Sequence, residues 1–326
     1  MNQFNRKYQR YRKLVDRQLR LSPGKREPSS LYVPVSYVLS GGGKRIRPLL
    51  VLLACEAVGG KARQALHAAV AVEILHNFTL VHDDIMDHAS SRRGRPTVHT
   101  RWDENIAILV GDELVALAYR ELLKTRSPLI ARVADVFTEG VVEVCEGQVY
   151  DKEFENRNDV SLREYLLMID KKTGKMVSVA SEMGAIIGGG NEREIRALRS
   201  YGFYIGRAFQ IQDDLLDVVA DEKEFGKTIG GDIVEGKKTY LLIRAYERAR
   251  GADKKLLRRI INEGGTSKKN IPAVRDIYDR CGAIAQAKSA VSQNIRRANS
   301  ELARLPRSRS VDMLLWFSEM LLTRNS

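Results

Sequence analysis

Three observations predict a fold that is almost entirely α-helical. Long stretches carry apolar residues at intervals of three and four, none alternates apolar and polar residues as a half-buried strand would, and glycine or proline separates successive stretches. Of the 326 residues, 44% are hydrophobic and 29% are charged, which suits a protein that buries a sizeable core. No linker interrupts the pattern. We therefore expect residues 1–326 to form a single-domain bundle of roughly ten or more helices around a central cavity.

The first four predicted helices are delimited by turn-forming residues. A charged amphipathic stretch ends at a Ser-Pro-Gly turn, and a short helix then ends at three consecutive glycines. Pro48 can open the next helix at its first turn, and that helix is nearly all apolar, so it should be buried. The fourth is alanine-rich and contains neither glycine nor proline. These helices are predicted over residues 2–21, 31–39, 49–58 and 62–87.

The remaining helices follow the same signals. Residues 90–100 are polar and rich in arginine, so we expect a loop there. Beyond this loop, Ser-Pro, Asn-rich and Gly-rich segments separate the helical patterns. The predicted helices cover residues 111–124, 131–155, 161–187, 192–219, 237–250, 271–303 and 311–322.

An acidic cluster closes the fourth predicted helix. Asp83, Asp84 and Asp87 lie within five positions, and the first and last are one helical turn apart, on the same face. Like charges this close raise one another's pKa, and the helix dipole disfavours negative charge at a C-terminus. The cluster therefore needs a cation, and hard carboxylate oxygens favour Mg²⁺ over softer metals.

The chain repeats this arrangement. Asp213, Asp214 and Asp217 have the same spacing and again end a predicted helix. A loop with glycine and basic residues follows each cluster, so two parts of the chain share the layout of helix, aspartates and basic loop. A single cluster is most often a solvated helix end, whereas this repetition indicates a function.

Short basic segments accompany the two clusters. They contain Lys44 with Arg47, Arg92 with Arg93, Lys171 with Lys172, and Lys227 with Lys237. Mg²⁺ together with Arg and Lys is what a diphosphate group needs, because metals bridge its oxygens and guanidinium groups bond them in pairs. No Ser-His pair lies in either cluster. The residues thus predict a Mg²⁺-dependent enzyme that acts on diphosphates by activating a leaving group.

The overall charge narrows the choice of partner. A formal net charge of +13 admits nucleic acid, an anionic membrane surface or a phosphorylated small molecule. No basic and aromatic platform or zinc-finger spacing supports nucleic acid, so we expect none. No apolar run approaches a membrane span of about 20 residues, and no apolar core follows the basic start. We expect a cytoplasmic enzyme without a transmembrane segment.

At this point the motifs resemble those of one family, the trans-isoprenyl diphosphate synthases or polyprenyl synthetases, from about Leu31 to about Tyr240. A lone Asp-Asp-x-x-Asp is weak, but five motifs in the family's order are specific. They are Gly42–Pro48, Asp83–Asp87 followed by Arg92-Arg93-Gly94, Lys172-Thr173-Gly174, Phe209–Asp217, and Gly226-Lys227 with Gly236-Lys237.

The resemblance implies an isoprenoid synthase-type fold and a role for each matched residue. Asp83, Asp87 and Asp213 would bind three Mg²⁺ ions per active site, while Asp84 and Asp217 would orient metal-bound water. The allylic diphosphate would be held by Arg92, Lys172, Lys227 and Lys237, and Thr173 and Gln210 would face the carbocation. The isopentenyl diphosphate site would consist of Lys44, Arg47, His76 and Arg93.

The implied reaction is a condensation of isopentenyl diphosphate with dimethylallyl, geranyl or farnesyl diphosphate. Phe78 lies five residues before Asp83, a little over one helical turn, and so should form the floor below the metal site. An aromatic residue at this position resembles the arrangement in the family's short-chain enzymes, and the neighbouring Thr79 is small. We therefore favour geranylgeranyl diphosphate as the product over farnesyl diphosphate.

Several alternatives stay open. The product could be farnesyl diphosphate or a longer polyprenyl diphosphate. Alternatively, the protein could belong to another class, as the non-catalytic regulatory subunit of a heteromeric prenyl synthase, although both aspartate clusters are intact. A metal-dependent phosphohydrolase would leave the second cluster unexplained, and a terpene cyclase would not need Lys44 and Arg47. The family resemblance also implies a homodimer.

Overall fold

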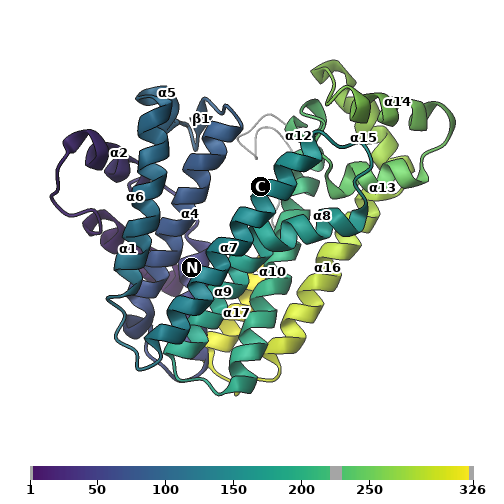
Figure 1. Cartoon of the computed structure of the whole chain (residues 1–326). Coiled ribbons are helices and arrows are strands. Elements are labelled where there is room, and N and C mark those ends of the chain that lie inside the picture. The colour runs from purple at the N-terminus through teal and green to yellow at the C-terminus, as the bar shows by residue number, and fades with distance from the viewer. Residues whose placement is uncertain (1–2, 221–229, 323–326) are drawn as a thin grey trace. The chain divides into compact units, whose positions relative to one another are not determined.

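The computed structural model describes residues 3–220 and 230–322. Over these residues the chain is almost entirely helical, as the sequence predicts (Figure 1). The α-helices are α1 Gln3–Leu21, α2 Ser29–Leu39, α3 Ile46–Ala57, α4 Leu66–Met86, α5 Val98–Arg101, α6 Glu104–Leu122, α7 Ile130–Glu155, α8 Leu162–Ile169, α9 Lys175–Ile187, α10 Glu192–Val219, α12 Gly231–Val234, α13 Tyr240–Arg248, α14 Gly251–Asn262, α15 Ile271–Arg280, α16 Ala283–Leu302 and α17 Arg309–Leu322. No helix of the described chain is long and apolar enough to cross a membrane.

The chain divides into two compact units. Unit 1 consists of Met1–Val141, Val179–Arg199 and Leu305–Leu314, and unit 2 of Val142–Ser178, Ser200–Arg304 and Leu315–Ser326. The first aspartate cluster belongs to unit 1 and the second to unit 2.

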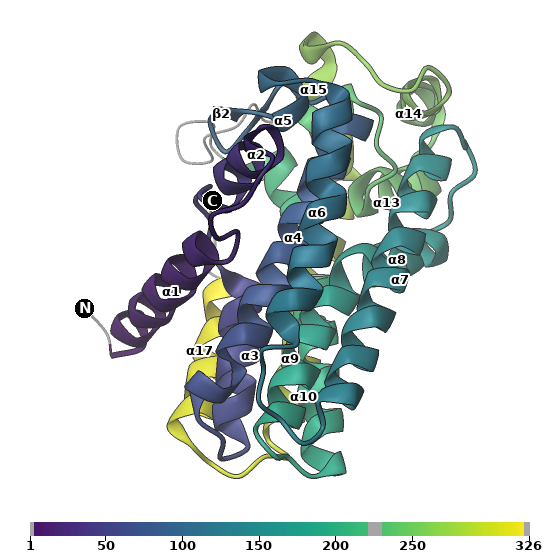
Figure 2. The same ribbon diagram turned by 60° about the vertical axis from the view of Figure 1, so that its left-hand side comes forward.

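Unit 1 is built on the pairing of α4 with α6, which run side by side (Figure 2). Helix α3 packs on α4 and is buried from Leu49 through Cys55, as its apolar sequence predicts. A side chain on Gly184 of α9 would lie 2.2 Å from the carbonyl oxygen of Val51, so only glycine permits this close approach. The aspartates at the end of α4 therefore rest on a rigid apolar support.

Unit 2 contains a group of shorter helices around α13, which contacts α8, α14, α15 and α16 (Figure 1). Leu241, Leu242 and Ile243 of α13 are all buried. Thr239 caps α13, since its hydroxyl accepts a hydrogen bond from the amide of Leu242 at 3.4 Å. The helix that follows Lys237 is thus fixed at its first residue.

The arginine-rich segment after the first cluster is a small β-hairpin and not the predicted loop. Strands β1 Ser91–Arg92 and β2 Arg95–Pro96 pair antiparallel. The two turn residues, Arg93 and Gly94, have φ angles of 54° and 71°, as a type I′ turn requires. Strands of two residues are too short to show alternation, which is why the sequence pattern gives no sign of them.

Helix boundaries differ from the prediction at several places. Helix α6 begins at Glu104, well before the predicted residue 111, because Asp103 accepts a hydrogen bond from the amide of Ile106 and caps it. The predicted helix 271–303 is wrong, since Gly282 at φ 71° separates α15 from α16. Helix α14 lies outside the predicted helical ranges.

The predicted helix 161–187 is interrupted by a π-helical turn, η2, over Asp170–Gly174. Two glycines permit neighbouring helices to approach this wide turn: a side chain on Gly147 would lie 2.4 Å from the amide nitrogen of Lys172, and one on Gly206 would lie 2.7 Å from the Cα of Gly174. Single π turns often mark functional positions in helices, and this one carries Lys172 and Thr173.

Candidate active site

The first aspartate cluster occupies the last turn of α4. The amide of Asp87 donates to the carbonyl oxygen of Asp83 at 2.8 Å, so these two residues are one helical turn apart, as predicted. Asp83 is half-buried and Asp87 is exposed, whereas Asp84 between them is buried. The cluster therefore separates into an outward pair of carboxylates and an inward one.

The inward carboxylate of Asp84 binds the hairpin. Its Oδ1 accepts a hydrogen bond from Nε of Arg92 at 2.6 Å. Burial raises the pKa of Asp84, although the positive charge of Arg92 opposes this. The pair connects the aspartate cluster directly to the arginine that was predicted to hold a diphosphate.

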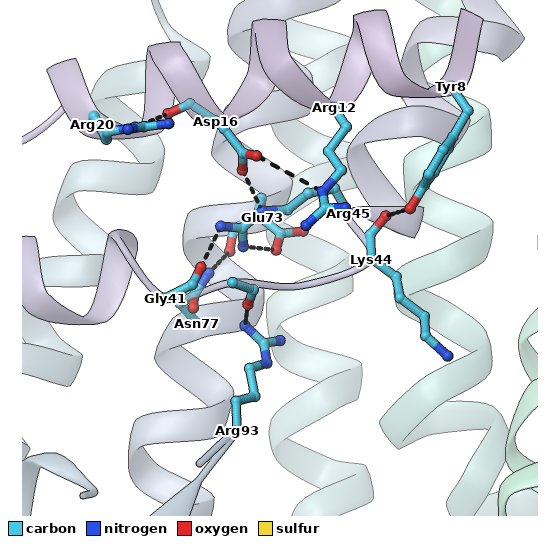
Figure 3. Close-up of polar contacts among 11 residues, drawn as sticks. Tyr8, Arg12, Asp16, Arg20, Gly41, Lys44, Arg45, Glu73, Asn77 and Arg93 are labelled. Carbon is cyan, nitrogen blue, oxygen red and sulfur yellow. Dashed lines mark hydrogen bonds and ion pairs between the residues drawn. The ribbon is translucent and has the colours of Figure 1, made fainter. Parts of the chain in front are cut away.

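The glycine-rich segment before α3 presents the second set of predicted ligands. Lys44 is exposed and points away from α1, while Arg47 is half-buried near the start of α3 (Figure 3). Arg93 of the hairpin turn donates a short hydrogen bond from its guanidinium to the carbonyl oxygen of Gly42. The loop and the hairpin thus bring Lys44 and Arg93 to one side of unit 1.

His76 lies on α4 among these cations. Burial, followed by the positive charges of Arg47, Arg93, Arg92 and Arg45, holds the pKa of His76 well below its usual value. The imidazole is therefore neutral near pH 7. A neutral donor surrounded by arginines suits an anionic ligand, since the guanidinium groups supply the charge and the imidazole can donate a hydrogen bond.

Phe78 is half-buried on α4. Its ring meets that of His82 edge to face, with the ring centroids 4.8 Å apart, and Nε2 of His82 lies 3.3 Å from the carbonyl oxygen of Ile108 on α6. A side chain on Gly111 would overlap the His82 ring at 2.0 Å. Phe78 is therefore supported from behind by a histidine that α6 holds in position.

The second cluster shows the same division between outward and inward carboxylates. Asp213 and Asp217 are half-buried on α10, and Asp214 is buried. Asp214 accepts three hydrogen bonds: from the hydroxyl of Tyr165 at 2.6 Å, from Nε2 of Gln210 at 3.1 Å and from the amide of Tyr240 at 3.3 Å. Burial raises its pKa to about 6, and the Tyr165 hydrogen bond is the strongest of those opposing the shift.

Asp217 faces the short helix α12. Its Oδ2 accepts a hydrogen bond from the amide of Asp232 at 3.1 Å, and its carboxyl pKa is raised by burial. Asp232 lies beside it, and burial and the charges of Asp214 and Asp217 raise the pKa of Asp232 to about 8. Asp232 is not among the residues predicted from the sequence, where its only signal is its place in the basic loop after the second cluster.

The π turn positions two further predicted residues. Nζ of Lys172 lies 2.6 Å from Oδ2 of Asp151, and the hydroxyl of Thr173 donates to Oε1 of Gln210 at 3.0 Å. Gln210 in turn donates to Asp214. Thr173, Gln210 and Asp214 therefore form one hydrogen-bonded chain, which connects two predicted motifs within unit 2.

The predicted lysines outside the two clusters have different surroundings. Nζ of Lys237 lies 2.9 Å from a carboxylate oxygen of Glu235 and 3.8 Å from one of Asp232, so this lysine is close to the acidic residues of its own segment. Lys227 lies outside the described residues. Lys171, the partner of Lys172 in the sequence motif, binds Glu143 and Glu146 and points to a separate acidic pair.

The carboxylates fit Mg²⁺ by their chemistry. Each cluster offers an outward pair of oxygen ligands spaced one helical turn apart, and Mg²⁺ characteristically uses one or two carboxylates, several waters and substrate phosphates. Within residues 3–220 and 230–322, no group of three or more His, Cys, Asp or Glu side chains is assembled as a metal cage. A site completed by water and a diphosphate accounts for both observations.

Comparisons with known proteins agree with these features. The sequence profile of the polyprenyl synthetase family matches residues 28–278. The chain is 40% identical over 316 residues to a short chain isoprenyl diphosphate synthase of Methanothermobacter thermautotrophicus, covering 97% of each chain. It is 38% identical over 299 residues to a geranylgeranyl diphosphate synthase of Methanosarcina mazei, covering 91% of this chain and 90% of the other.

The solved structure of geranylgeranyl pyrophosphate synthetase from Pyrococcus horikoshii matches the fold with a TM-score of 0.93, at 39% identity and with 98% of each chain covered. This confirms the predicted isoprenoid synthase-type fold class. The chain belongs to the polyprenyl synthetase family and is a prenyltransferase.

Proposed function

We propose that the chain condenses isopentenyl diphosphate with dimethylallyl, geranyl and farnesyl diphosphates in a Mg²⁺-dependent reaction, and that the main product is all-trans geranylgeranyl diphosphate. The observation that carries this proposal is the repeated cluster: each unit presents an outward pair of aspartates beside its own set of cationic side chains. The two clusters and the cations beside them suit one diphosphate bound through metal ions, and the separate basic group around His76 suits a second diphosphate. The proposal treats residues 1–326 as one polyprenyl synthetase domain.

Asp83, Asp87 and Asp213 are the proposed Mg²⁺ ligands, with three ions per active site. Bound there, the ions would stabilise the negative charge that develops on the departing allylic diphosphate. Arg92, Lys172, Lys227 and Lys237 would neutralise the same group. The ion pair of Arg92 with Asp84 supports this, because it orients the cation beside the first cluster. For Lys172 the support is its neighbour Thr173, which is hydrogen-bonded to Gln210 and through it to Asp214 of the second cluster.

Lys44, Arg47, His76 and Arg93 are the proposed ligands of isopentenyl diphosphate. Their support is the neutral His76 beside the positive charges of Arg47 and Arg93. Such a group favours a multiply charged anion and gives it directional hydrogen bonds. A monophosphate would leave part of this positive charge without a counter-charge, so we expect a diphosphate.

Thr173 and Gln210 would face the allylic carbocation. Their oxygen atoms meet in a hydrogen bond, and oxygen dipoles can stabilise a nearby positive charge without acting as nucleophiles. Water must be kept from the cation, because it would trap it as an alcohol. We propose that the released diphosphate accepts the proton that is lost after condensation.

Phe78 is proposed to limit the length of the product. Its edge-to-face contact with His82, and the contact of His82 with α6, keep the ring in place. Phe78→Ala should lengthen the product by at least one five-carbon unit, as measured by chromatography of the dephosphorylated prenols. Phe137→Ala, which changes another buried aromatic residue of unit 1, is the control. An unchanged product in the Phe78 variant would place the floor elsewhere.

The deciding experiment incubates the purified chain alone with Mg²⁺, isopentenyl diphosphate and each of the three allylic diphosphates. A twenty-carbon product that disappears with EDTA supports the proposal. Farnesyl diphosphate or longer chains would correct the product while retaining the reaction. Absence of any product from the purified chain would favour a regulatory subunit, and release of inorganic phosphate without prenyl product would favour a phosphohydrolase.

The proposal includes a homodimer and a cytoplasmic location. Support for the dimer comes from exposed apolar residues on two helices. On α6, Ile108 and Leu109 are exposed, and on α7, Val142 and Val149 are exposed and lie two helical turns apart on one face. Light scattering after size-exclusion chromatography should give twice the chain mass, and Val142→Glu with Val149→Glu should give the monomer. Cell fractionation tests the location.

A further inference from the structure

A buried arginine connects α1 to the loop that carries Lys44. Arg45 is 5% exposed, and its guanidinium lies between two carboxylates: Nε is 2.8 Å from Oδ1 of Asp16 on α1, and Nη1 is 2.7 Å from Oε1 of Glu73 on α4 (Figure 3). Burial alone would lower the pKa of Arg45, but the charge of Glu73 and the hydrogen bond to Asp16 outweigh it and raise the pKa. We call Asp16, Arg45 and Glu73 the ion triad.

The backbone at Arg45 is as unusual as its side chain. Its φ and ψ angles of 52° and 39° are left-handed, and it is the residue that immediately precedes α3. Such a conformation costs a residue with a side chain about 1 kcal/mol or more, and it persists only where the surrounding contacts fix it. Here the two carboxylates of the ion triad supply that fixation.

Three carbonyl oxygens of the same loop are held by side chains from three places. Nη2 of Arg45 donates to Gly41 at 2.5 Å, the hydroxyl of Tyr8 donates to Lys44 at 2.6 Å, and the guanidinium of Arg93 donates to Gly42 (Figure 3). A side chain on Gly43 would come within 3.1 Å of the Arg93 guanidinium. The loop is therefore fixed through its backbone, while Lys44 remains exposed.

The ion triad, in which Arg45 and Glu73 are buried and Asp16 is half-buried, contributes little to stability by itself. The cost of removing three charges from water offsets most of their attraction, and replacement by apolar residues of similar size is often neutral or stabilising. A different role is needed to account for these residues, and their position suggests one. Arg45 is the direct neighbour of Lys44 and lies two residues before Arg47.

We propose that the ion triad is a positioning device for the segment Gly41–Arg47, which is the loop before α3 and its first turn, and that through Asp16 and Tyr8 the helix α1 forms part of the support of the isopentenyl diphosphate site. The triad residues do not touch substrate. They fix the turn into α3, which sets the directions of Lys44 and Arg47 relative to Arg93. This inference rests on the proposed function, in which those three side chains bind the second diphosphate.

The test separates the two substrates. Glu73→Gln and Asp16→Asn are each expected to raise the KM for isopentenyl diphosphate by about tenfold, because small displacements of binding groups have large effects. The KM for the allylic diphosphate should change by less than about twofold. Tyr8→Phe removes one hydrogen bond to the loop and should raise the KM for isopentenyl diphosphate by about threefold. Calorimetric titration with isopentenyl diphosphate alone should give the same ratios in Kd.

The double variant Arg45→Met with Glu73→Leu distinguishes positioning from stability. It removes the two most buried charges together, so the melting temperature should stay close to that of the unchanged protein. The KM for isopentenyl diphosphate should nevertheless rise by about tenfold or more. This variant remains informative even if single substitutions of Arg45 do not fold.

Glu121→Gln is the matched control. Glu121 is also fully buried in unit 1, and it binds His67 on α4 at 2.6 Å, Gln18 on α1 at 3.1 Å and Lys124 at 2.6 Å. It connects the same helices without contacting the loop. Its substitution should lower the melting temperature and leave the KM for isopentenyl diphosphate unchanged.

Equal changes in the KM of both substrates, or a rise in the Glu121 variant as large as in the Glu73 variant, would show a merely structural role and overturn the inference. An unchanged KM in the double variant would do the same. If the unchanged protein formed no prenyl product, the proposed function itself would fail, and that outcome is seen before any variant is measured.

Discussion

The two aspartate clusters have the same sequence spacing, but different kinds of partner bind their inward carboxylates. Asp84 in unit 1 binds the guanidinium of Arg92, a charged partner on a two-stranded hairpin. Asp214 in unit 2 is bound by a tyrosine hydroxyl, a glutamine amide and a backbone amide, all of them neutral. The first cluster is therefore coupled to a cation that can also meet a substrate, whereas the second is built into a fixed hydrogen-bonded frame.

The difference is also visible in the backbone around each cluster. Near the first cluster, the tight contact at Gly111 is with the far end of the His82 side chain. Near the second, the tight contact at Gly147 is with the backbone of the π turn. A side chain can move aside and a backbone cannot, so the second cluster should be the less tolerant of substitution.

The largest expected effect is common to both clusters. Asp83→Ala and Asp213→Ala should each lower turnover by about a hundredfold to a thousandfold, because each removes a group that stabilises the leaving diphosphate. Steady-state rates at saturating substrate measure this, with circular dichroism to show an intact fold. Asp135→Ala, an exposed acid on α7, is the control. Unchanged turnover in either variant would remove that cluster from the proposed site.

The inward carboxylates should differ. Asp84→Asn removes the charge that orients Arg92 and should raise the KM for the allylic diphosphate by about tenfold. Asp214→Asn keeps its shape and loses one of three hydrogen bonds, so it should cost about 1 kcal/mol of stability with little change in KM. Kinetics and thermal unfolding of both variants provide the measurement. Equal shifts in KM would contradict the distinction between a coupled and a fixed cluster.

The glycine contacts allow a further comparison. Gly147→Ala should destabilise the protein by about 1–3 kcal/mol, since the new methyl group meets the backbone of Lys172. Gly111→Ala should cost less, because the His82 ring can rotate away. Chemical denaturation of the two variants measures both values. A larger loss at Gly111 would mean that the first cluster is the more rigid of the two.

The smallest effect concerns the helix that leads into the π turn. Ser161 and Glu164 form a capping box at the start of α8, whereas α4 has no side-chain cap. Ser161→Ala should cost about 0.5–1 kcal/mol.

The same capping box has a pH dependence. The Ser161 hydrogen bonds lower the pKa of Glu164 to about 2. A lowered carboxyl pKa stabilises the fold above the unfolded value, about 4.3, and this stability is lost as pH falls through the folded value. The difference in melting temperature between the unchanged protein and Glu164→Gln should therefore shrink from pH 5 toward pH 2. If that difference did not change with pH, the lowered pKa of Glu164 would not be the cause.

Much of the fold could be predicted because its signals are local. The run from residue 62 to the first cluster is helical as predicted, apart from a first 3-10 turn, η1 Ala62–Ala65. Helices α7 and α10 also match closely. Apolar periodicity and glycine breaks are sufficient where a helix is long and ends at a strong turn signal.

The failures have physical reasons too. The apolar period continues through residues 161–187, so nothing in the pattern reports that one turn is widened to a π turn. The predicted helix 271–303 includes Gly282, whose positive φ ends α15. Two-residue strands at Ser91 and Arg95 depend on the turn between them and leave no periodic signal.

The roles of neighbouring basic residues were the least predictable part of the site. Lys44, Arg45 and Arg47 stand in one motif and have the same sign of charge, yet Lys44 is exposed and Arg45 is buried against two carboxylates. The partners that decide this, Asp16 and Glu73, lie 29 and 28 residues away. No local pattern contains that information.

The π turn has a consequence for insertions and deletions. A π turn holds one more residue than an α-helical turn, so deleting one residue from Asp170–Gly174 would restore an ordinary α-helical turn and leave the flanking helices in register. The residues that the wide turn carries would then shift, among them Thr173, which contacts Gln210. The extra residue of this segment is consequently part of its chemistry, and a one-residue gap here in any relative would mark a protein with a different arrangement at this position.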